Sequence, residues 1–359
     1  MTSTLRRDAP VAVGPGRRGV AVPLLAASAV LLASMTVAVS VGPAGIAPAD
    51  VWASVAHHLT GLLGAGTGTA PLGPLLDGVV WELRLPRVLT AAAVGAGLAL
   101  CGAVMQSLTR NPLADPYLLG LSAGASLGAV SVIVLGISLL LPVAAFVGAF
   151  LAMAAALGLA GSLGTLTPGR TVLAGLAVAQ LCAAATSFVI FWSATGDSYR
   201  DILAWLMGSL AGAGWADVAI AVTAVAVLGT GLVGSARTLD AFAFGDAAAT
   251  ALGIDVPRTR WVLLTAVALL TGGLVAVSGS IGFVGLIVPH AVRLVVGAPH
   301  RRLLPLSALV GAIFLVWADT AARALFEPRE LPVGIVTAFV GAPVFAALLW
   351  QRRTASAEL

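Results

Sequence analysis

Ten near-continuous apolar runs dominate this sequence and restrict what it can fold into. They lie at 20–41, 85–107, 117–136, 139–161, 171–194, 216–235, 259–279, 281–297, 303–325 and 333–350. An α-helix needs about 20 apolar residues to cross the hydrocarbon core of a bilayer. Only 9% of the residues are charged, against roughly 25% in soluble domains, so lipid must cover most of the surface. The alternating pattern of a β-barrel is absent. We therefore predict an all-α membrane protein with about ten transmembrane helices.

The arginines predict the orientation of these helices. All nineteen basic residues are arginine, and cytoplasmic loops are enriched in basic residues. With the N-terminus inside, fourteen arginines fall in cytoplasmic segments. Both termini are then cytoplasmic, residues 1–19 form a tail and residues 20–351 form the transmembrane domain of a multi-pass protein of the bacterial cytoplasmic membrane. The first run is longer than a secretion signal's apolar stretch, which favours a span over a cleaved signal.

Several function classes are disfavoured by residues that the chain lacks. Without lysine it has no phosphate-binding loop of the Walker A type, so it should not hydrolyse ATP itself. An ATP-independent carrier or an intramembrane enzyme needs ionisable groups clustered within spans, and the spans offer little beyond Asp319 and His290. Asp319 precedes Arg323 by four residues, so an ion pair on one helix face is expected. The scattered arginines disfavour a nucleic-acid partner.

No metal site is predicted. His57 and His58 are adjacent, which makes a weak metal or haem site, and a solvated outer loop is the favoured interpretation. Cys101 and Cys182 lie in apolar runs and are expected to be small core residues.

Two segments between spans have a pattern of their own. The outer segment 196–215 is expected to form a short amphipathic helix with tryptophan anchors. In the cytoplasmic segment 236–260, Asp246 is expected to cap a short helix that Gly253 closes. A short helix held off the bilayer needs something to pack on, which predicts a cytoplasmic protein partner.

Glycines 120, 124 and 128 recur every fourth residue at the start of the third span. Small residues at this spacing let helices approach closely. We expect Gly120, Gly124 and Gly128 to pack against a neighbouring helix, and lining a path for a large solute is the alternative.

Six further motifs lie in the chain from Arg84 onward. They are RLPR (Arg84–Arg87), GAVMQ (Gly102–Gln106), NPLADPYLLG (Asn111–Gly120), WLMGSLAGAGW (Trp205–Trp215), GFVGLIVPHAVRL (Gly282–Leu294) and ELPVGIVTAFVGAPVFAALL (Glu330–Leu349). In this order and spacing they resemble the FecCD-type permeases, the membrane subunits of ATP-driven importers for iron-siderophores, haem and vitamin B12.

This resemblance implies the type II importer permease fold and a set of partners. Such permeases pair as homo- or heterodimers, bind two cytoplasmic ATPase subunits that hold ATP and Mg²⁺, and receive solute from an extracytoplasmic binding protein. No cofactor is expected in this chain itself.

The resemblance also implies roles for individual residues. Arg84, Arg87 and Arg323 match arginines that dock the binding protein. The segment Asp240–Gly253 matches the coupling helix that contacts the ATPase, with Asp240, Phe242, Phe244, Asp246, Leu252 and Gly253 as its candidate residues. Thr165 and Thr167 lie in a turn that the family places beside the dimer axis, where they are candidates for an inner gate.

We therefore expect the permease subunit of an ATP-driven importer that works by alternating access at a dimer interface. Iron(III)-siderophore is the favoured cargo, and haem or cobalamin is the alternative. An ATP-independent secondary transporter is the less favoured alternative.

Overall fold

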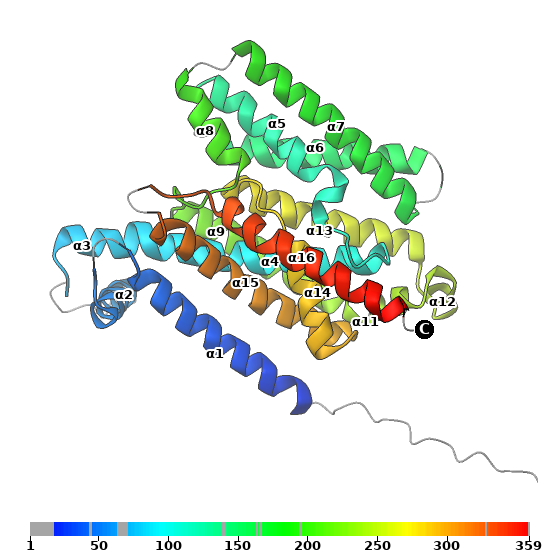
Figure 1. The fold of residues 1–359 in the computed structure, drawn as a ribbon, viewed down its shortest axis with the longest axis horizontal. Coiled ribbons are helices and arrows are strands. Elements are labelled where there is room, and N and C mark those ends of the chain that lie inside the picture. Colours follow the sequence, from blue (N-terminus) through cyan, green and yellow to red (C-terminus); the bar gives the residue numbers. More distant parts are fainter. Residues whose placement is uncertain are drawn as a thin grey trace, which may run out of the picture.

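A computed structural model describes residues 18–42, 45–62, 71–137, 141–162, 164, 167–193, 196–326 and 329–357. Within these ranges the chain is a bundle of helices without a β-strand. Figure 1 shows α4 near the centre of the bundle, α5 to α8 gathered on one flank and α1 along the opposite flank. The predicted all-α class is therefore confirmed.

Every predicted span corresponds to a helix. The helices are α1 (Arg18–Ser40), α4 (Leu85–Leu108), α5 (Leu121–Val134), α6 (Leu141–Ser162), α7 (Pro168–Ser193), α9 (Trp215–Ala224) continued by η4 (Val225–Gly229) and α10 (Thr230–Gly234), α13 (Val256–Ser278), α14 (Val284–Val296), α15 (His300–Ala324) and α16 (Val333–Ala357). Among the described residues, seven helical stretches are long and apolar enough to cross a membrane, and α5, α14 and residues 333–347 of α16 form shorter apolar helices.

Two of the predicted spans are shorter than their apolar runs. The run at 117–136 begins with a 3₁₀ turn, η2 (Pro116–Leu119), and α5 starts only after Gly120, whose φ is +78°. The run at 281–297 begins irregularly, because Phe283 has a φ of +68° and α14 starts at Val284. A helix of 14 residues is about 21 Å long, which is less than the roughly 30 Å of the hydrocarbon core. Irregular backbone therefore completes both crossings.

These two irregular stretches meet inside the bundle. The hydroxyl of Tyr117 donates to the carbonyl of Ile281 at 3.0 Å and accepts from the amide N–H of Ile281 at 3.3 Å. Ser122 and Ser280 are joined by a hydrogen bond of 2.6 Å between their hydroxyls. Backbone polar groups at membrane depth must be satisfied by protein when lipid surrounds them, and these side chains do so.

The helix α4 forms the centre of the core because glycines let its neighbours approach closely. A Cβ placed on Gly95 would lie 2.2 Å from the carbonyl oxygen of Gly311 in α15, and one on Gly102 would lie 1.8 Å from that of Gly285 in α14. Side chains at these positions would hold the helices apart. The pairs α4–α15 and α4–α14 therefore pack backbone against backbone.

The structure places the glycine repeat in close contact with neighbouring helices. A Cβ on Gly124 would lie 2.4 Å from the oxygen of Gly148, and one on Gly128 would lie 2.1 Å from that of Ala144, so both residues face α6. Gly120 lies against Gly175 of α7. All three glycines serve helix contacts within this chain.

Short helices lie between the spans at both ends. On the end that we call the outer side are α2 (Pro48–Leu62), α3 (Pro74–Gly78), the π-helical turn η1 (Val79–Arg84) and α8 (Gly196–Leu206). On the opposite, inner side are α11 (Ala236–Ala243) and α12 (Asp246–Ala251). In Figure 1 the start of α1 and the C-terminus lie on the side of α11 and α12, as expected for termini on one face.

The outer segment before the second span was predicted as a loop, which is wrong, because His57 and His58 lie on α2. The imidazole of His58 stacks on Trp81 with 4.2 Å between ring centroids, and its Nε2 lies 2.8 Å from Asp77. Asp77 also accepts from the hydroxyl of Ser54 at 2.6 Å. These contacts fix α2 onto α3 and η1. Among the described residues no group of three or more His, Cys, Asp or Glu side chains is arranged to hold a metal ion.

We expect Gly124→Ala to destabilise the bundle, because the added methyl would meet backbone of α6. Overpacked substitutions cost about 1–3 kcal/mol, and thermal unfolding of the purified protein in detergent would measure the loss. Gly158→Ala in α6 is the matched control, since nothing lies within 4 Å of its added Cβ. Equal stability of the two variants would contradict the close contact.

Candidate functional site

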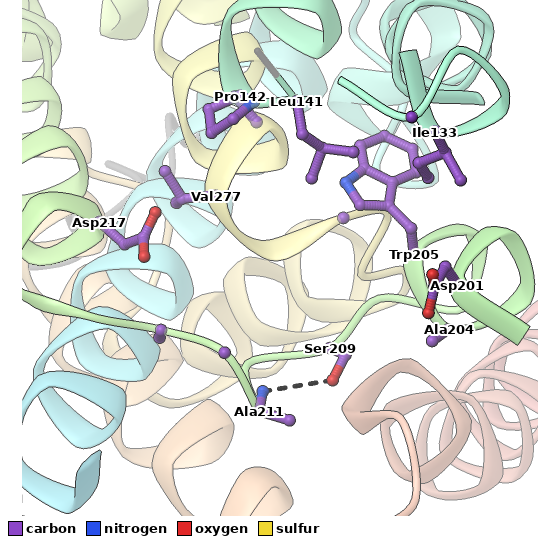
Figure 2. A pocket seen from close by; sticks show the side chains of 15 residues that line it. Ile133, Leu141, Pro142, Asp201, Ala204, Trp205, Ser209, Ala211, Asp217 and Val277 are labelled. Carbon is purple, nitrogen blue, oxygen red and sulfur yellow. Dashed lines mark hydrogen bonds between the residues drawn. The ribbon is translucent and has the colours of Figure 1, made fainter. Parts of the chain in front are cut away.

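A cavity of about 700 Å³ opens on the outer side behind α8. Figure 2 shows Trp205 of α8 facing Ile133 and Leu141, with the carboxylates of Asp201 and Asp217 lying apart from each other across the cavity. Ser209 accepts from the amide of Ala211 at 3.3 Å. The lining contains two carboxylates and no basic side chain. It therefore offers no partner for an anionic chelate.

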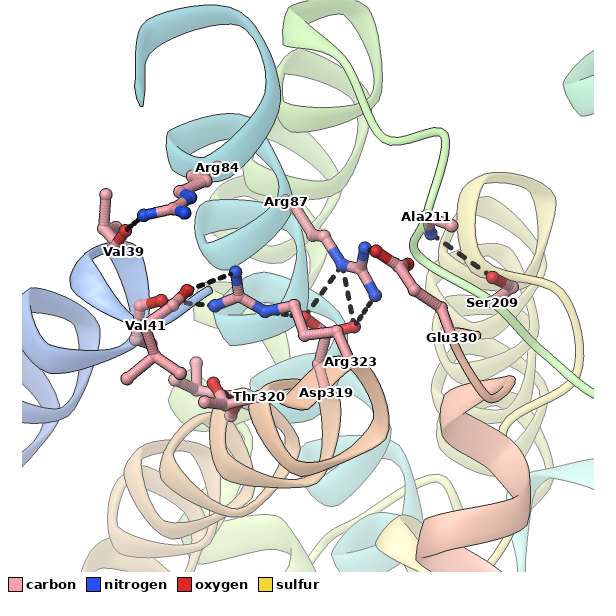
Figure 3. Close-up of polar contacts among 12 residues, drawn as sticks. Val39, Val41, Arg84, Arg87, Ser209, Ala211, Asp319, Thr320, Arg323 and Glu330 are labelled. Carbon is pink, nitrogen blue, oxygen red and sulfur yellow. Dashed lines mark hydrogen bonds and ion pairs between the residues drawn. The ribbon is translucent and has the colours of Figure 1, made fainter. Parts of the chain in front are cut away.

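A cluster of buried charges lies nearby on the outer side, between α4 and α15. The Arg87 guanidinium binds both carboxylate oxygens of Asp319 at 2.9–3.0 Å, and its Nη1 lies 2.7 Å from Glu330. Figure 3 shows Arg87 between these two acids. The Arg323 Nε is 3.7 Å from Asp319, so the expected pair on α15 is present, with Arg87 as the closer partner. We call Arg84, Arg87, Asp319, Arg323 and Glu330 the outer charge cluster.

The outer charge cluster also holds the end of α1. Arg84 donates to the carbonyls of Val39 and Ser40 at 3.1 and 3.2 Å, and Arg323 donates to those of Val41 and Ala38. The last carbonyls of a helix have no partner within it, and basic side chains satisfy them well. Since α1 is mostly exposed in this chain, these bonds are its main polar attachment among the described contacts.

The three arginines that were expected to dock a binding protein are therefore placed below the surface. Arg84, Arg87 and Arg323 are 6%, 7% and 8% exposed, whereas the Glu330 side chain is 48% exposed. An Arg-to-Glu reversal at Arg87 would put a third carboxylate beside Asp319 and Glu330, so it would disturb the bundle itself. Docking by these arginines stays a prediction, and Glu330 is the charged member that the motif alone did not reveal.

The expected coupling segment consists of two short helices rather than one. The chain breaks at Gly245, whose φ of +97° places it before α12 as the N-cap, so the predicted capping by Asp246 is wrong. The Asp246 carboxylate instead binds Arg260 of α13 at 2.9 Å. Gly253, with a φ of +81°, follows the end of α12, as predicted. The pair Asp246–Arg260 thereby fastens α12 to the bundle.

The apolar residues of this segment divide into two groups. Phe242 is 1% exposed and lies under the guanidinium of Arg260, 5.5 Å from its ring centroid. Phe244 and Leu252 are 82% and 69% exposed. Phe242 is thus a core residue of the permease and cannot contact a partner in this conformation. Phe244 and Leu252 are the exposed large apolar side chains of this segment, on the inner side.

Asp240 faces inward from α11 and binds the start of α15. Its Oδ1 accepts from the His300 backbone amide at 2.9 Å and lies 2.7 Å from His300 Nδ1. The other ring nitrogen of His300 is hydrogen-bonded to the hydroxyl of Ser107 in α4. Asp240 was expected in the coupling segment, but its two partners lie far from it in sequence and were not foreseen.

The candidate inner gate is described only in part. Thr165 lies outside the described residues. Thr167 precedes α7, where its hydroxyl accepts from the amide of Arg170 at 3.4 Å and its carbonyl accepts from the Thr171 amide at 3.0 Å. This is the position of a helix cap. The gate assignment for Thr165 and Thr167 stays a prediction.

Helices of membrane-spanning length, a buried charge cluster at the outer end and exposed apolar side chains at the inner end define a polytopic helical membrane protein. Residues 30–351 match the model of the FecCD transport family. The chain therefore belongs to the FecCD transport family, whose members are multi-span permeases of the cytoplasmic membrane.

Named relatives include permeases for different solutes. The chain is 46% identical over 276 residues to the cobalamin import system permease protein BtuC of Halobacterium salinarum, covering 76% of this chain and 74% of the relative. It is 44% identical over 279 residues to the Fe(3+) dicitrate transport system permease protein FecD of Escherichia coli, covering 77% and 86%. A solved structure described as an inward-facing metal-chelate type ABC transporter superposes with a TM-score of 0.78 at 30% identity, covering 91% of this chain and 98% of that one.

We expect Asp319→Asn to destabilise the protein strongly, because it leaves the buried Arg87 and Arg323 guanidinium groups without their shared carboxylate. Removing one partner of a buried pair costs about 3–5 kcal/mol. Thermal unfolding in detergent measures the loss. Glu330→Gln is the control, since exposed pairs contribute about 1 kcal/mol or less. A loss for Asp319→Asn no larger than that of the control would contradict the pairing.

Proposed function

We propose that this permease, paired with a second permease subunit and two cytoplasmic ATPase subunits, imports a metal chelate delivered by an extracytoplasmic binding protein. The observation that carries the proposal is the apolar surface of Phe244 and Leu252 on the inner side. The chain has no lysine for a phosphate-binding loop, so the energy of ATP must reach it through contact with another protein. This surface offers such a contact.

Membership of the family indicates the class of cargo. Relatives that carry cobalamin and ferric dicitrate are almost equally similar to this chain. Within this class we propose iron(III)-siderophore as the first candidate, and the relative from Halobacterium favours cobalamin as the second. Uptake of radiolabelled ferric siderophore and of radiolabelled cobalamin by cells that produce the complete transporter separates the two.

The dimer contact is proposed on α7 and α16. Both helices display large apolar side chains in the single chain, including Phe188, Phe191 and Trp192 on α7 and Phe339 on α16. A second permease subunit or lipid covers such faces. The pathway for the chelate would then run between the two subunits. This position agrees with the close glycine contacts between helices within each subunit.

We expect Phe244→Ala combined with Leu252→Ala to weaken binding of the ATPase subunits by tenfold or more, because interface anchors contribute about 1–3 kcal/mol each. Binding of purified ATPase to the permease in lipid nanodiscs measures the effect. Leu75→Ala on α3 is the matched control, since Leu75 is 81% exposed on the outer side. Wild-type ATPase affinity of the double variant would overturn the proposed contact.

We also propose that the outer charge cluster receives the binding protein by exchanging one carboxylate for another. Glu330 is half-exposed and binds Arg87 at 2.7 Å, so it occupies the place that a carboxylate of the binding protein would take. Docking would release Glu330 to solvent while Arg87 keeps its bond to Asp319. Arg84 and Arg323, which are buried in the outer charge cluster, would add positive charge to the docking site.

We expect Glu330→Gln to speed capture of the binding protein, because it removes the competing charge from Arg87. Charge pairs at an interface mainly change the association rate and weaken with salt. Association rates measured at low and high ionic strength test this, with the exposed Glu82→Gln on η1 as the control. An association rate equal to or below that of the wild type at low salt would contradict the exchange.

A further inference from the structure

Three polar side chains join the inner segment to the core of the bundle. Asp240 of α11 is bonded to His300 at the first residue of α15, and His300 is bonded to Ser107 in the last turn of α4. Asp240 accepts from both the backbone amide and the ring of His300. A carboxylate is an acceptor only, so Nδ1 of His300 carries the hydrogen that Asp240 accepts, and Nε2 is hydrogen-bonded to the Ser107 hydroxyl.

The order Ser–His–Asp has the connectivity of a hydrolase triad, but burial excludes that chemistry here. Ser107 is 4% exposed and the His300 side chain is 3% exposed. The Ser107 hydroxyl also lies 3.1 Å from the carbonyl of Ala103 in its own helix. A nucleophile must reach a substrate carbonyl, and this hydroxyl is enclosed by helices. The chain of bonds therefore serves a contact between helices.

The two helices that receive these bonds form a stiff unit. Between the inner and outer ends, α4 and α15 touch at Gly95 and Gly311, where there is no room for a side chain. At the outer ends they are joined by Arg87 and Asp319. A helix of 24 residues is about 36 Å long, and polar bonds at both ends with close packing between them prevent the pair from sliding.

The proposed ATPase contact and the α4–α15 pair are both joined to α11. Asp240 precedes the exposed Phe244 by four residues, and α11 ends at Ala243. The Asp240 carboxylate also sits at the N-terminus of α15, where the helix dipole favours a negative charge. Any displacement of α11 by a partner is therefore applied directly to the beginning of α15 and, through His300, to the end of α4.

We propose that Asp240, His300 and Ser107 form a strut that positions α11 against the α4–α15 pair, so that movement of the ATPase contact is carried to the outer charge cluster. Asp240 and Ser107 are positioning residues that act through His300. This inference rests on the proposed function, because it assumes that α11 and α12 contact an ATPase. It adds the route by which that contact reaches the side that faces the binding protein.

The test uses the complete transporter in proteoliposomes with its ATPase subunits and loaded binding protein. For each variant, the ratio of stimulated to unstimulated ATP hydrolysis and the solute transported per ATP are measured. We expect Ser107→Ala and Asp240→Ala each to lower both ratios about fivefold, the equivalent of one net hydrogen bond. Asp240→Asn keeps an acceptor oxygen and should restore most of the coupling.

Asp255→Ala is the matched control. Asp255 lies in the same inner segment, but it only caps α13 by accepting from the Arg258 amide at 3.1 Å. If Ser107→Ala and Asp240→Ala change the two ratios no more than Asp255→Ala does, the strut is overturned. Ser107 is buried away from the exposed surface, so Ser107→Ala decides the question even if Asp240→Ala fails to assemble.

A distance measurement gives a second readout. Spin labels at Arg237→Cys on α11 and Arg301→Cys on α15, with Cys101 and Cys182 replaced, report whether these helices move together. The strut requires the label distance to stay the same with and without ATP, and to vary in Asp240→Ala, which removes the bond between these two helices. A distance that changes with ATP in the otherwise wild-type chain overturns it. If the wild-type chain binds no ATPase and transports nothing, the proposed function itself has failed.

Discussion

The buried contact between Arg87 and Asp319 fixes the outer half of this permease. It joins α4 to α15, and through Glu330 it also reaches the segment before α16. Two charges removed from water are stable only when their remaining hydrogen-bonding groups are satisfied, which explains why Arg87 has two acidic partners and why Arg323 turns to the carbonyls of α1. A first helix with little burial of its own is thereby attached to the core.

The inner end follows a different principle. There Phe244 and Leu252 are exposed to solvent, while Phe242 is buried beneath Arg260. Polar bonds hold the segment in place from behind, at Asp246 and Asp240. The charged side chains of the outer charge cluster are thus paired within the bundle, while Phe244 and Leu252 present apolar side chains on the inner side.

The spans could be predicted from sequence because lipid forces each of them to be a continuous apolar run. The glycine repeat of α5 was also readable, since small residues at helical spacing have few other uses in a membrane. The burial of the arginines in the outer charge cluster could not be predicted from the sequence, because it depends on Asp319, which lies more than two hundred residues from Arg87. The break at Gly245 was missed because Asp246 next to it has the chemistry of a helix cap. Helix α2 was missed because the adjacent His57 and His58 favoured a solvated loop, although Val51 and Val55 on one face of the helix are buried in the core.

The hydroxyl of Tyr117 has a consequence for how the membrane stays sealed. It both donates to and accepts from the backbone of Ile281, a residue that is 1% exposed and belongs to no helix. An unpaired backbone group at that position would recruit water, and a file of water molecules conducts protons. By bonding to both groups, Tyr117 leaves neither backbone group of Ile281 free to bind water.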